Sequence, residues 1–337
     1  MAAVVRRAAG EAAVTGVFDG AALLARVVRG GVGASYVESE HRGHVVVVDA
    51  AGRVLERRGE PDADVLPRSS LKPVQAVAML RAGVALTTPQ LALATASHAG
   101  EPRHLDVARS TLEGAGLGPA DLQTPPSLPG STASLPAWFA AGRGPEPIAH
   151  TCSGKHAAML ATCVAAGWPT ATYRDPGHPL QAAIRESLGD LLGEDPRGVA
   201  VDGCGAPAFV ASLTGLARAF ARLAVAPAGT PEAAVAAAMR AEPWLVAGTG
   251  RLATSIMTAV PGAIAKDGAD GVLAVALPDG TAVAVKAADG AMRPCAPAVA
   301  AALRSVGAQV PTEWADAPVL GRGGRVGSVL AWDEQLP

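Results

Sequence analysis

The sequence lacks several features that would place it in a specialised class of protein. No uninterrupted apolar segment is long enough to cross a membrane, and no apolar run of signal-peptide length follows Arg6 and Arg7. There is no block of basic residues, and the formal net charge is only -2 over 337 residues. We therefore expect a cytoplasmic protein whose partners are small molecules or proteins, with no nucleic acid and no membrane among them.

Cysteine and lysine are both scarce. The four cysteines are too few for a disulfide framework in a chain of this length, so reduced thiols or a metal site are expected. Of the 28 basic residues only four are lysines, namely Lys72, Lys155, Lys266 and Lys286. Arginine does not deprotonate in a protein whereas a buried lysine can, so a lysine kept in such an arginine-rich chain suggests a need for an amine.

Apolar residues, in contrast, are plentiful. Half of the sequence is hydrophobic and 17% is charged, which is enough apolar material for a globular core. The length is compatible with one large domain or two ordinary ones. Disorder over most of the chain is excluded by this composition.

Strands are expected at both ends of the chain and helices between them. The predicted strands are a hairpin over 44–57, a short buried strand at 199–202, and later strands at 262–266, 271–277 and 281–286. The predicted helices cover 71–81, 88 toward 97, 101–116, 154–167 and 209–223, with loops at 123–131 and 142–147. This order predicts a mixed α/β fold in which early and late strands share one mainly antiparallel sheet flanked by helices.

The segment from Ser69 to Lys72 carries the first candidate chemistry. It is expected to open a helix, where the i, i+3 spacing brings the Ser69 hydroxyl and the Lys72 amine to one face within hydrogen-bond reach. A neutral Lys72 can then take the serine proton, and the helix dipole favours negative charge on the attacking oxygen. The plainer alternative is a serine that caps a helix beside an exposed lysine.

Two further polar motifs follow in order along the chain. Ser97 begins a Ser-His-Ala-Gly-Glu-Pro segment, and Lys266 begins Lys-Asp-Gly at the end of a predicted strand. Ser-x-x-Lys, then a serine motif, then Lys-x-Gly is similar to the order in serine β-lactamases and penicillin-binding proteins. Asp267 stands where those enzymes have Thr or Ser, and the second motif is not Ser-Asp-Asn, so a β-lactam target is the weaker interpretation.

The third constellation combines two cysteines with a basic side chain. Cys152 precedes a predicted helix whose N-terminus would lower its thiol pKa, and Cys204 lies in a glycine-flanked bend. With Lys155 or His156 these thiols can hold a zinc ion, with water as the fourth ligand. The alternative is that cysteines pack as small apolar side chains, which is our expectation for the other two, Cys163 and Cys295.

Five segments together resemble the signature segments of the thermolabile L-asparaginase family. They are residues 67–75 (PRSSLKPVQ), 97–102 (SHAGEP), 152–156 (CSGKH), 202–205 (DGCG) and 265–268 (AKDG), and they occur in the family order. The resemblance implies a serine β-lactamase-like fold and the hydrolysis of L-asparagine to L-aspartate and ammonia. It further implies a homodimer and a single asparaginase-type catalytic unit over residues 1–337, with two subdomains left open.

Carried over residue by residue, the resemblance implies two Ser-Lys pairs that face one pocket, Ser69 with Lys72 and Ser97 with Lys266. It also implies a zinc ion bound by Cys152, Lys155, Cys204 and a water molecule, with His156 and Asp202 as orienting residues beside the metal. Lys155 would have to be a neutral amine, because an ammonium group has no lone pair to donate. Lys286 is left without a role and is expected to be an ordinary strand-end charge.

The resulting hypothesis is a two-step acyl transfer in which Ser69 is the nucleophile, Lys72 its base, and Ser97 with Lys266 a proton relay. Ser97 as the nucleophile stays open. Arg68 is the candidate partner for the α-carboxylate of asparagine, and a positioning or structural role is expected for zinc. Two other interpretations remain, a serine β-lactamase or D,D-peptidase-like hydrolase and a non-catalytic amino-acid-binding protein on the same fold.

Overall fold

The structure is a computed structural model that describes residues 18–315, 317–321 and 323–336. Its centre is an eight-stranded sheet with the order β6-β7-β8-β2-β1-β10-β9, in which β3 also pairs with β2 and all neighbours are antiparallel. The strands of this sheet are β1 (Ala22–Gly30), β2 (Ser35–Val48), β3 (Val54–Arg58), β6 (Ile264–Gly268), β7 (Val272–Ala276), β8 (Ala282–Ala287), β9 (Ala317–Gly321) and β10 (Gly324–Ala331).

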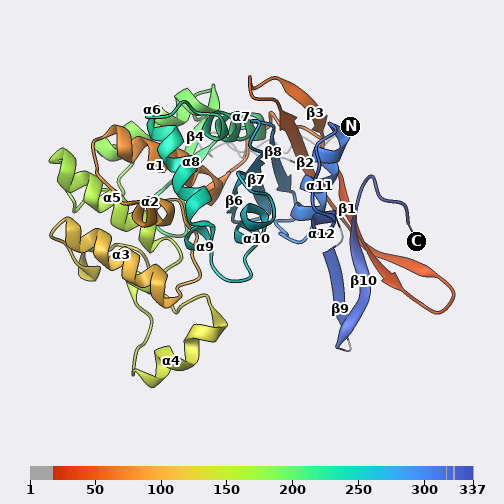
Figure 1. Cartoon of the computed structure of the whole chain (residues 1–337), viewed down its shortest axis with the longest axis horizontal. Coiled ribbons are helices and arrows are strands. Elements are labelled where there is room, and N and C mark those ends of the chain that lie inside the picture. Colours follow the sequence, from red (N-terminus) through yellow and green to blue (C-terminus); the bar gives the residue numbers. More distant parts are fainter. Residues whose placement is uncertain (1–17, 316, 322, 337) are drawn as a thin grey trace, which may run out of the picture.

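Helices form most of the rest of the molecule, and most of them lie together, apart from α11 and α12, which lie beside the strands (Figure 1). The α-helices are α1 (Lys72–Arg81), α2 (Thr88–Ala94), α3 (Pro102–Gly114), α4 (Leu135–Ala140), α5 (Ser153–Ala166), α6 (Pro179–Leu192), α7 (Leu213–Ala224), α8 (Pro231–Ala241), α9 (Pro243–Val246), α10 (Leu252–Ala259), α11 (Cys295–Ser305) and α12 (Thr312–Ala315). Short 3-10 helices are η1 (Arg68–Leu71), η2 (Pro119–Asp121), η3 (Thr132–Ser134) and η4 (Pro147–Ala149), and β4 (Gly198–Val201) pairs with β5 (Pro207–Val210) as a separate hairpin.

The middle of the sheet is covered on both faces. Strands β7 and β8 are buried at every position, as are the last residues of β2, which is the pattern of strands with side chains packed above and below. Helices α7 and α11 contact these strands. In contrast, the first six residues of β2 are exposed, and the β1–β2 hairpin extends beyond the helices in Figure 1.

The predicted architecture is confirmed. Residues 43–48 of β2 pair with residues 282–287 of β8, so an early and a late strand lie side by side in one antiparallel sheet flanked by helices. None of the described helices has both the length and the apolar character that a membrane span requires.

Two local predictions are wrong. The strand predicted at 199–202 exists as β4, but it is exposed rather than buried because it pairs only with β5. The helix predicted from Phe209 begins at Leu213, because residues 207–210 form β5 and Ser212 caps the helix by accepting the N–H of Gly215. A continuous apolar stretch does not by itself show where a strand ends and a helix begins.

Candidate active site

Two close approaches between elements bring the candidate residues together. Strand β6, which carries Lys266, runs beside η1, and a Cβ added to Gly268 would lie 2.4 Å from the carbonyl oxygen of Pro67. Helix α5 begins against α2, where a Cβ on Gly154 would lie 2.4 Å from the Leu93 side chain. Both distances are too short for a real side chain, so glycine at these positions allows the elements to meet.

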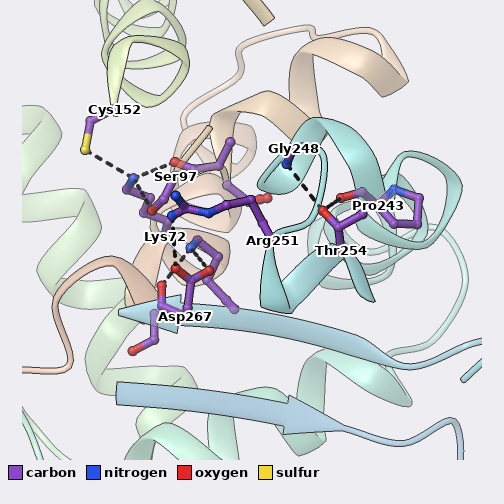
Figure 2. Close-up of polar contacts among 12 residues, drawn as sticks. Lys72, Ser97, Cys152, Pro243, Gly248, Arg251, Thr254 and Asp267 are labelled. Atoms are coloured by element: carbon purple, nitrogen blue, oxygen red, sulfur yellow. Dashed lines mark hydrogen bonds and ion pairs between the residues drawn. The ribbon is translucent and has the colours of Figure 1, made fainter. Parts of the chain in front are cut away.

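Lys72 lies at the centre of the site, and only 1% of it is exposed. Its Nζ donates to the carbonyl oxygen of Ala96, to Oγ of Ser97 at 3.0 Å and to Sγ of Cys152 at 3.2 Å (Figure 2). The serine that Lys72 contacts is therefore Ser97, in the loop between α2 and α3. A buried amine within hydrogen-bond reach of a hydroxyl is the arrangement that a general base needs.

Ser69 lies in η1, directly before the helix that begins with Lys72. It is half-buried, whereas Ser97 is 7% exposed. Within the described structure, the Ser69 hydroxyl forms no hydrogen bond with Lys72, because the Lys72 amine points toward the α2–α3 loop instead. The structure thus brings both serines near Lys72 in the fold but joins only one of them to its amine.

Lys266 is fully buried in β6 and contacts its own neighbour. Its Nζ donates to the backbone oxygen of Asp267 at 2.7 Å and to its Oδ1 at 3.0 Å, and it forms no hydrogen bond with Ser97 among the described residues. Burial, aided by the charge of Lys72, lowers the pKa of Lys266 to about 8 although Asp267 opposes the shift. The amine can therefore lose its proton close to neutral pH.

The loop that carries Ser97 is held by its neighbours. The N–H of Ser97 donates to the Val246 carbonyl oxygen at 3.0 Å, and the N–H of His98 donates to that of Thr151 at 3.0 Å. The His98 ring is buried with Nε2 2.9 Å from Oγ of Ser153, and burial keeps its pKa well below the usual value. A neutral His98 therefore anchors this loop to α5.

Arg251 is a candidate that the motifs did not single out. Its side chain extends toward Asp267 in Figure 2, where Nη2 lies 3.9 Å from Oδ2, and it is 44% exposed. Its turn is tied to the Ser97 loop, since the Glu101 carboxylate accepts the N–H of Thr249 at 2.9 Å and its hydroxyl at 3.0 Å. Gly248, at φ 123°, lies so close to Glu101 that a Cβ would come within 2.9 Å of Oε1. A glycine-rich turn ending in arginine was the available signal, but sequence does not show what that arginine faces.

Arg68 is already engaged by two carboxylates. Its Nη2 lies 2.7 Å from Oδ1 of Asp202, and its Nη1 lies 2.8 Å from Oδ2 of Asp270. The backbone of Arg68 has φ 54°, a conformation that a long side chain adopts only when its surroundings enforce it. Arg68 would have to release one of these partners to bind the carboxylate of a ligand.

The two cysteines and the lysine of the predicted metal site lie together. Nζ of Lys155 is 3.4 Å from Sγ of Cys204, and Cys152 and Cys204 form a small buried cluster with Ala206. Contact with Cys204 lowers the pKa of Cys152 well below the usual value, and the charges of Lys72 and Lys155 act in the same direction against burial. Burial works to lower the pKa of Lys155, but Cys204, Cys152 and Asp202 together outweigh it and raise that pKa.

The surroundings of this cluster suit a metal ion. His156 is fully buried, its Nδ1 lies 2.6 Å from the Tyr173 hydroxyl, and its Nε2 has no hydrogen-bond partner within the described structure. Burial lowers the pKa of His156 to about 4, although the nearby Cys204 opposes the shift. Burial opposes ionisation of Asp202, but Lys155 and Arg68 keep its pKa low.

Two thiols and an amine are a donor set that zinc accepts. No group of three or more His, Cys, Asp or Glu side chains in the described ranges is arranged to hold a metal, so Lys155 would have to be the third protein ligand. Because metal binding requires deprotonated donors, it would displace a proton from the Lys155 amine. The other two cysteines, Cys163 and Cys295, are buried free thiols, as expected.

Comparison with known proteins gives one match that covers most of the chain. The sequence profile described as L-asparaginase II matches residues 25–331. No curated protein sequence matches the chain.

The similar solved structures are remote. Mglu in its native form has 15% identity and a TM-score of 0.42, with 79% of this chain and 64% of that chain covered. Mglu in 4.3 M NaCl has 14% identity and a TM-score of 0.44, with 78% and 60% covered, so this chain spans less than two thirds of both. A β-lactamase from Mycobacterium bovis has 15% identity and a TM-score of 0.40, with 78% and 94% covered. At such scores these likenesses carry no argument about activity.

Proposed function

The chain belongs to the L-asparaginase II family, and on that premise we propose that this hydrolase cleaves the side-chain amide of L-asparagine to give L-aspartate and ammonia. The observation that carries the proposal is the buried contact of 3.0 Å between Nζ of Lys72 and Oγ of Ser97. Ser69 lies in η1, the 3-10 turn that precedes the helix beginning at Lys72, and the buried amine of Lys266 lies close enough to Lys72 for their charges to interact. One hydroxyl in contact with a buried amine, with a second serine in the preceding turn and a second buried amine nearby, supports acyl transfer to a serine.

In the proposed first step, Oγ of Ser69 attacks the amide carbon while Lys72, as a neutral amine, takes the hydroxyl proton. The C–N bond breaks, and the leaving nitrogen receives this proton through Lys72 and Ser97 and departs as ammonia. Water then attacks the aspartyl ester and gives one proton to the Lys72 amine. Lys72 returns this proton to Oγ of Ser69 as aspartate leaves. We assign the attack to Ser69 because it is half-buried and accessible, whereas Ser97 is 7% exposed.

The function is tested by ammonia release from L-asparagine and from L-glutamine by the purified full chain, with bound zinc quantified in the same preparation. Release from asparagine would support the proposal. Release from neither amide by folded protein would contradict it. In that case, covalent labelling by penicillin would favour a β-lactamase-type hydrolase, and asparagine binding without turnover would favour a binding protein.

We further propose that zinc is held by Cys152, Lys155 and Cys204. When bound, it would supply a positive charge that keeps both thiols deprotonated and orients a substrate oxygen. The buried cluster of Cys152 and Cys204, with Nζ of Lys155 3.4 Å from Sγ of Cys204, supports this site. The homodimer and the cytoplasmic location stay predictions.

Lys266→Met is expected to remove an inflection near pH 8 from the pH profile of kcat/KM. Burial lowers the pKa of Lys266 to about 8, so the amine is charged below that pH and neutral above it. If the neutral amine relays protons, activity rises with pH through this range. The matched control is Lys286→Met, which removes another buried lysine whose pKa is also lowered by burial. An inflection that persists in Lys266→Met would contradict the role of Lys266.

Arg251→Gln is expected to raise KM for asparagine about 10- to 100-fold with a smaller change in kcat, since a hydrogen bond to a charged group is worth about 1.5–3 kcal/mol. We assign the α-carboxylate of the substrate to Arg251 because its guanidinium faces the site with one loose ion pair of 3.9 Å, whereas Arg68 is held by two carboxylates. Steady-state kinetics would measure the change in KM. The control is Arg109→Gln, which replaces an arginine that forms an ion pair with Asp106 on the surface of α3. An unchanged KM would return the assignment to Arg68.

A further inference from the structure

A pocket with a volume of 480 Å³ lies beside Arg68. Its lining combines charged side chains, among them Arg68, Asp270 and Lys286, with apolar ones from the β4–β5 hairpin. None of the described residues that line it belongs to the cluster of Lys72, Ser97 and Lys266. The pocket therefore lies beside the centre proposed to cleave amides and includes Arg68, which directly precedes the proposed nucleophile Ser69.

Lys286 is not the strand-end surface charge expected from sequence. It is 6% exposed in β8, and its Nζ donates to the backbone oxygens of Asp270 and Ala287, at 2.5 and 2.8 Å. An ammonium group has three donors, so one remains for a ligand. The Phe18 ring centroid lies 5.3 Å from the same nitrogen, and the Asp270 carboxylate interacts with its charge. Burial still lowers the pKa of Lys286, so these contacts do not fully offset the cost of burying the cation.

A second unused donor lies opposite Lys286. His44 pairs with it across β2 and β8, and its Nδ1 accepts the N–H of Glu60 at 2.9 Å. The proton of the neutral ring is therefore on Nε2, which is buried without a hydrogen-bond partner in the described structure. The His44 ring stacks on Phe18, a pocket residue, with ring centroids 5.5 Å apart. His44 is fully buried and does not line the pocket, so of these two donors only Lys286 can reach a ligand there. Its positive charge favours an anionic group such as a carboxylate.

The opposite charge is available at the rim. The side chain of Asp270 is 69% exposed, and only its Oδ2 is occupied, by Arg68 at 2.8 Å. The Asp-Gly turn between β6 and β7 places Asp270 in the left-handed region at φ 58°, which aspartate tolerates. Its second carboxylate oxygen can accept a hydrogen bond from an ammonium group.

An apolar wall completes the pocket. Val65, Leu66, Val199 and Val210 line it, and Val199 is 41% exposed. Exposed valine beside charged groups is unfavourable unless something covers it, because apolar surface in contact with water costs about 25 cal/mol per Å². A ligand with a branched aliphatic side chain would cover this wall.

We propose that this pocket binds a free α-amino acid with an apolar side chain, its carboxylate on Lys286, its ammonium group on Asp270 and its side chain on the valine wall. The site is distinct from the one proposed to hydrolyse asparagine and does not depend on that function. Because Lys72, Ser97 and Lys266 do not line it, we expect L-leucine to bind without competing with the amide substrate.

The test is isothermal titration calorimetry of the full chain with L-leucine as the probe. Lys286→Met and Asp270→Asn are each expected to weaken binding about tenfold or more, because each removes a charged hydrogen bond. Asp270→Asn keeps the turn, since asparagine also adopts the left-handed region, so it stays informative if Lys286→Met does not fold. Asp279→Asn, in the turn between β7 and β8, is the matched control and should bind normally.

Two analogues separate the contacts. 4-Methylpentanoate lacks the ammonium group and 3-methylbutylamine lacks the carboxylate, so both should bind more weakly than L-leucine. The proposal is overturned if L-leucine does not bind the wild type, if both substitutions leave its affinity unchanged, or if L-asparagine displaces it competitively. Because binding is measured without turnover, failure here leaves the ammonia-release test unaffected.

Discussion

Ser69→Ala is expected to lower kcat for asparagine by at least about 10³-fold, because no other hydroxyl can take over the attack on the amide carbon from the same place. Ser97→Ala is expected to cost less, about 10²-fold, since it removes a relay but leaves the nucleophile. The difference follows from access, as Ser69 is half-buried and Ser97 is 7% exposed. Steady-state ammonia release by both variants measures it.

Hydroxylamine trapping distinguishes the two serines further. An aspartyl ester on Ser69 would be captured as aspartate hydroxamate by the wild type and, slowly, by Ser97→Ala, but not by Ser69→Ala. Ser110→Ala, on the exposed face of α3, is the control for the substitution itself. If Ser97→Ala lost all activity while Ser69→Ala kept most of it, the nucleophile would be Ser97, the serine that Lys72 contacts at 3.0 Å.

The central strands could be predicted from sequence because burial on both faces leaves a continuous apolar run, as in 272–276 and 282–285. Strands β1, β9 and β10 escaped prediction because they are only partly covered and carry arginine, serine and glycine among their apolar residues. Their place is set by pairing across the whole chain, such as Ala25 with Ala331, which no local pattern reveals.

The motifs identified the reactive side chains of the site, but not which of these side chains form hydrogen bonds with one another. Lys72 contacts Ser97 across 25 residues of chain because α2 returns the following loop to the start of α1. This contact depends on helix packing, so the sequence spacing favoured Ser69 instead. Lys266 likewise bonds Asp267 rather than a serine. The role of Arg251 could not be derived from sequence, because the function of an arginine after a glycine-rich turn depends on what the turn faces.

Lys72→Met is expected to reduce kcat about 10²- to 10⁴-fold, the usual contribution of a general base. The methionine keeps the aliphatic volume of the buried side chain but removes the amine that contacts Ser97 and Cys152. It also leaves the carbonyl oxygen of Ala96 without its donor, so a loss of about 1–3 kcal/mol in the free energy of unfolding is expected as well. Ammonia release and urea unfolding of the same preparation separate the two effects.

Lys72→Arg distinguishes a base from a structural cation. Arginine can donate to Ala96, Ser97 and Cys152 and preserves the positive charge, but it does not deprotonate in a protein. If Lys72 must be neutral to take the serine proton, Lys72→Arg should fold and remain as inactive as Lys72→Met. Near wild-type turnover by Lys72→Arg would mean that the site needs only a charge there, and the proton would have to go to Lys266, whose pKa of about 8 makes it the other amine able to receive it.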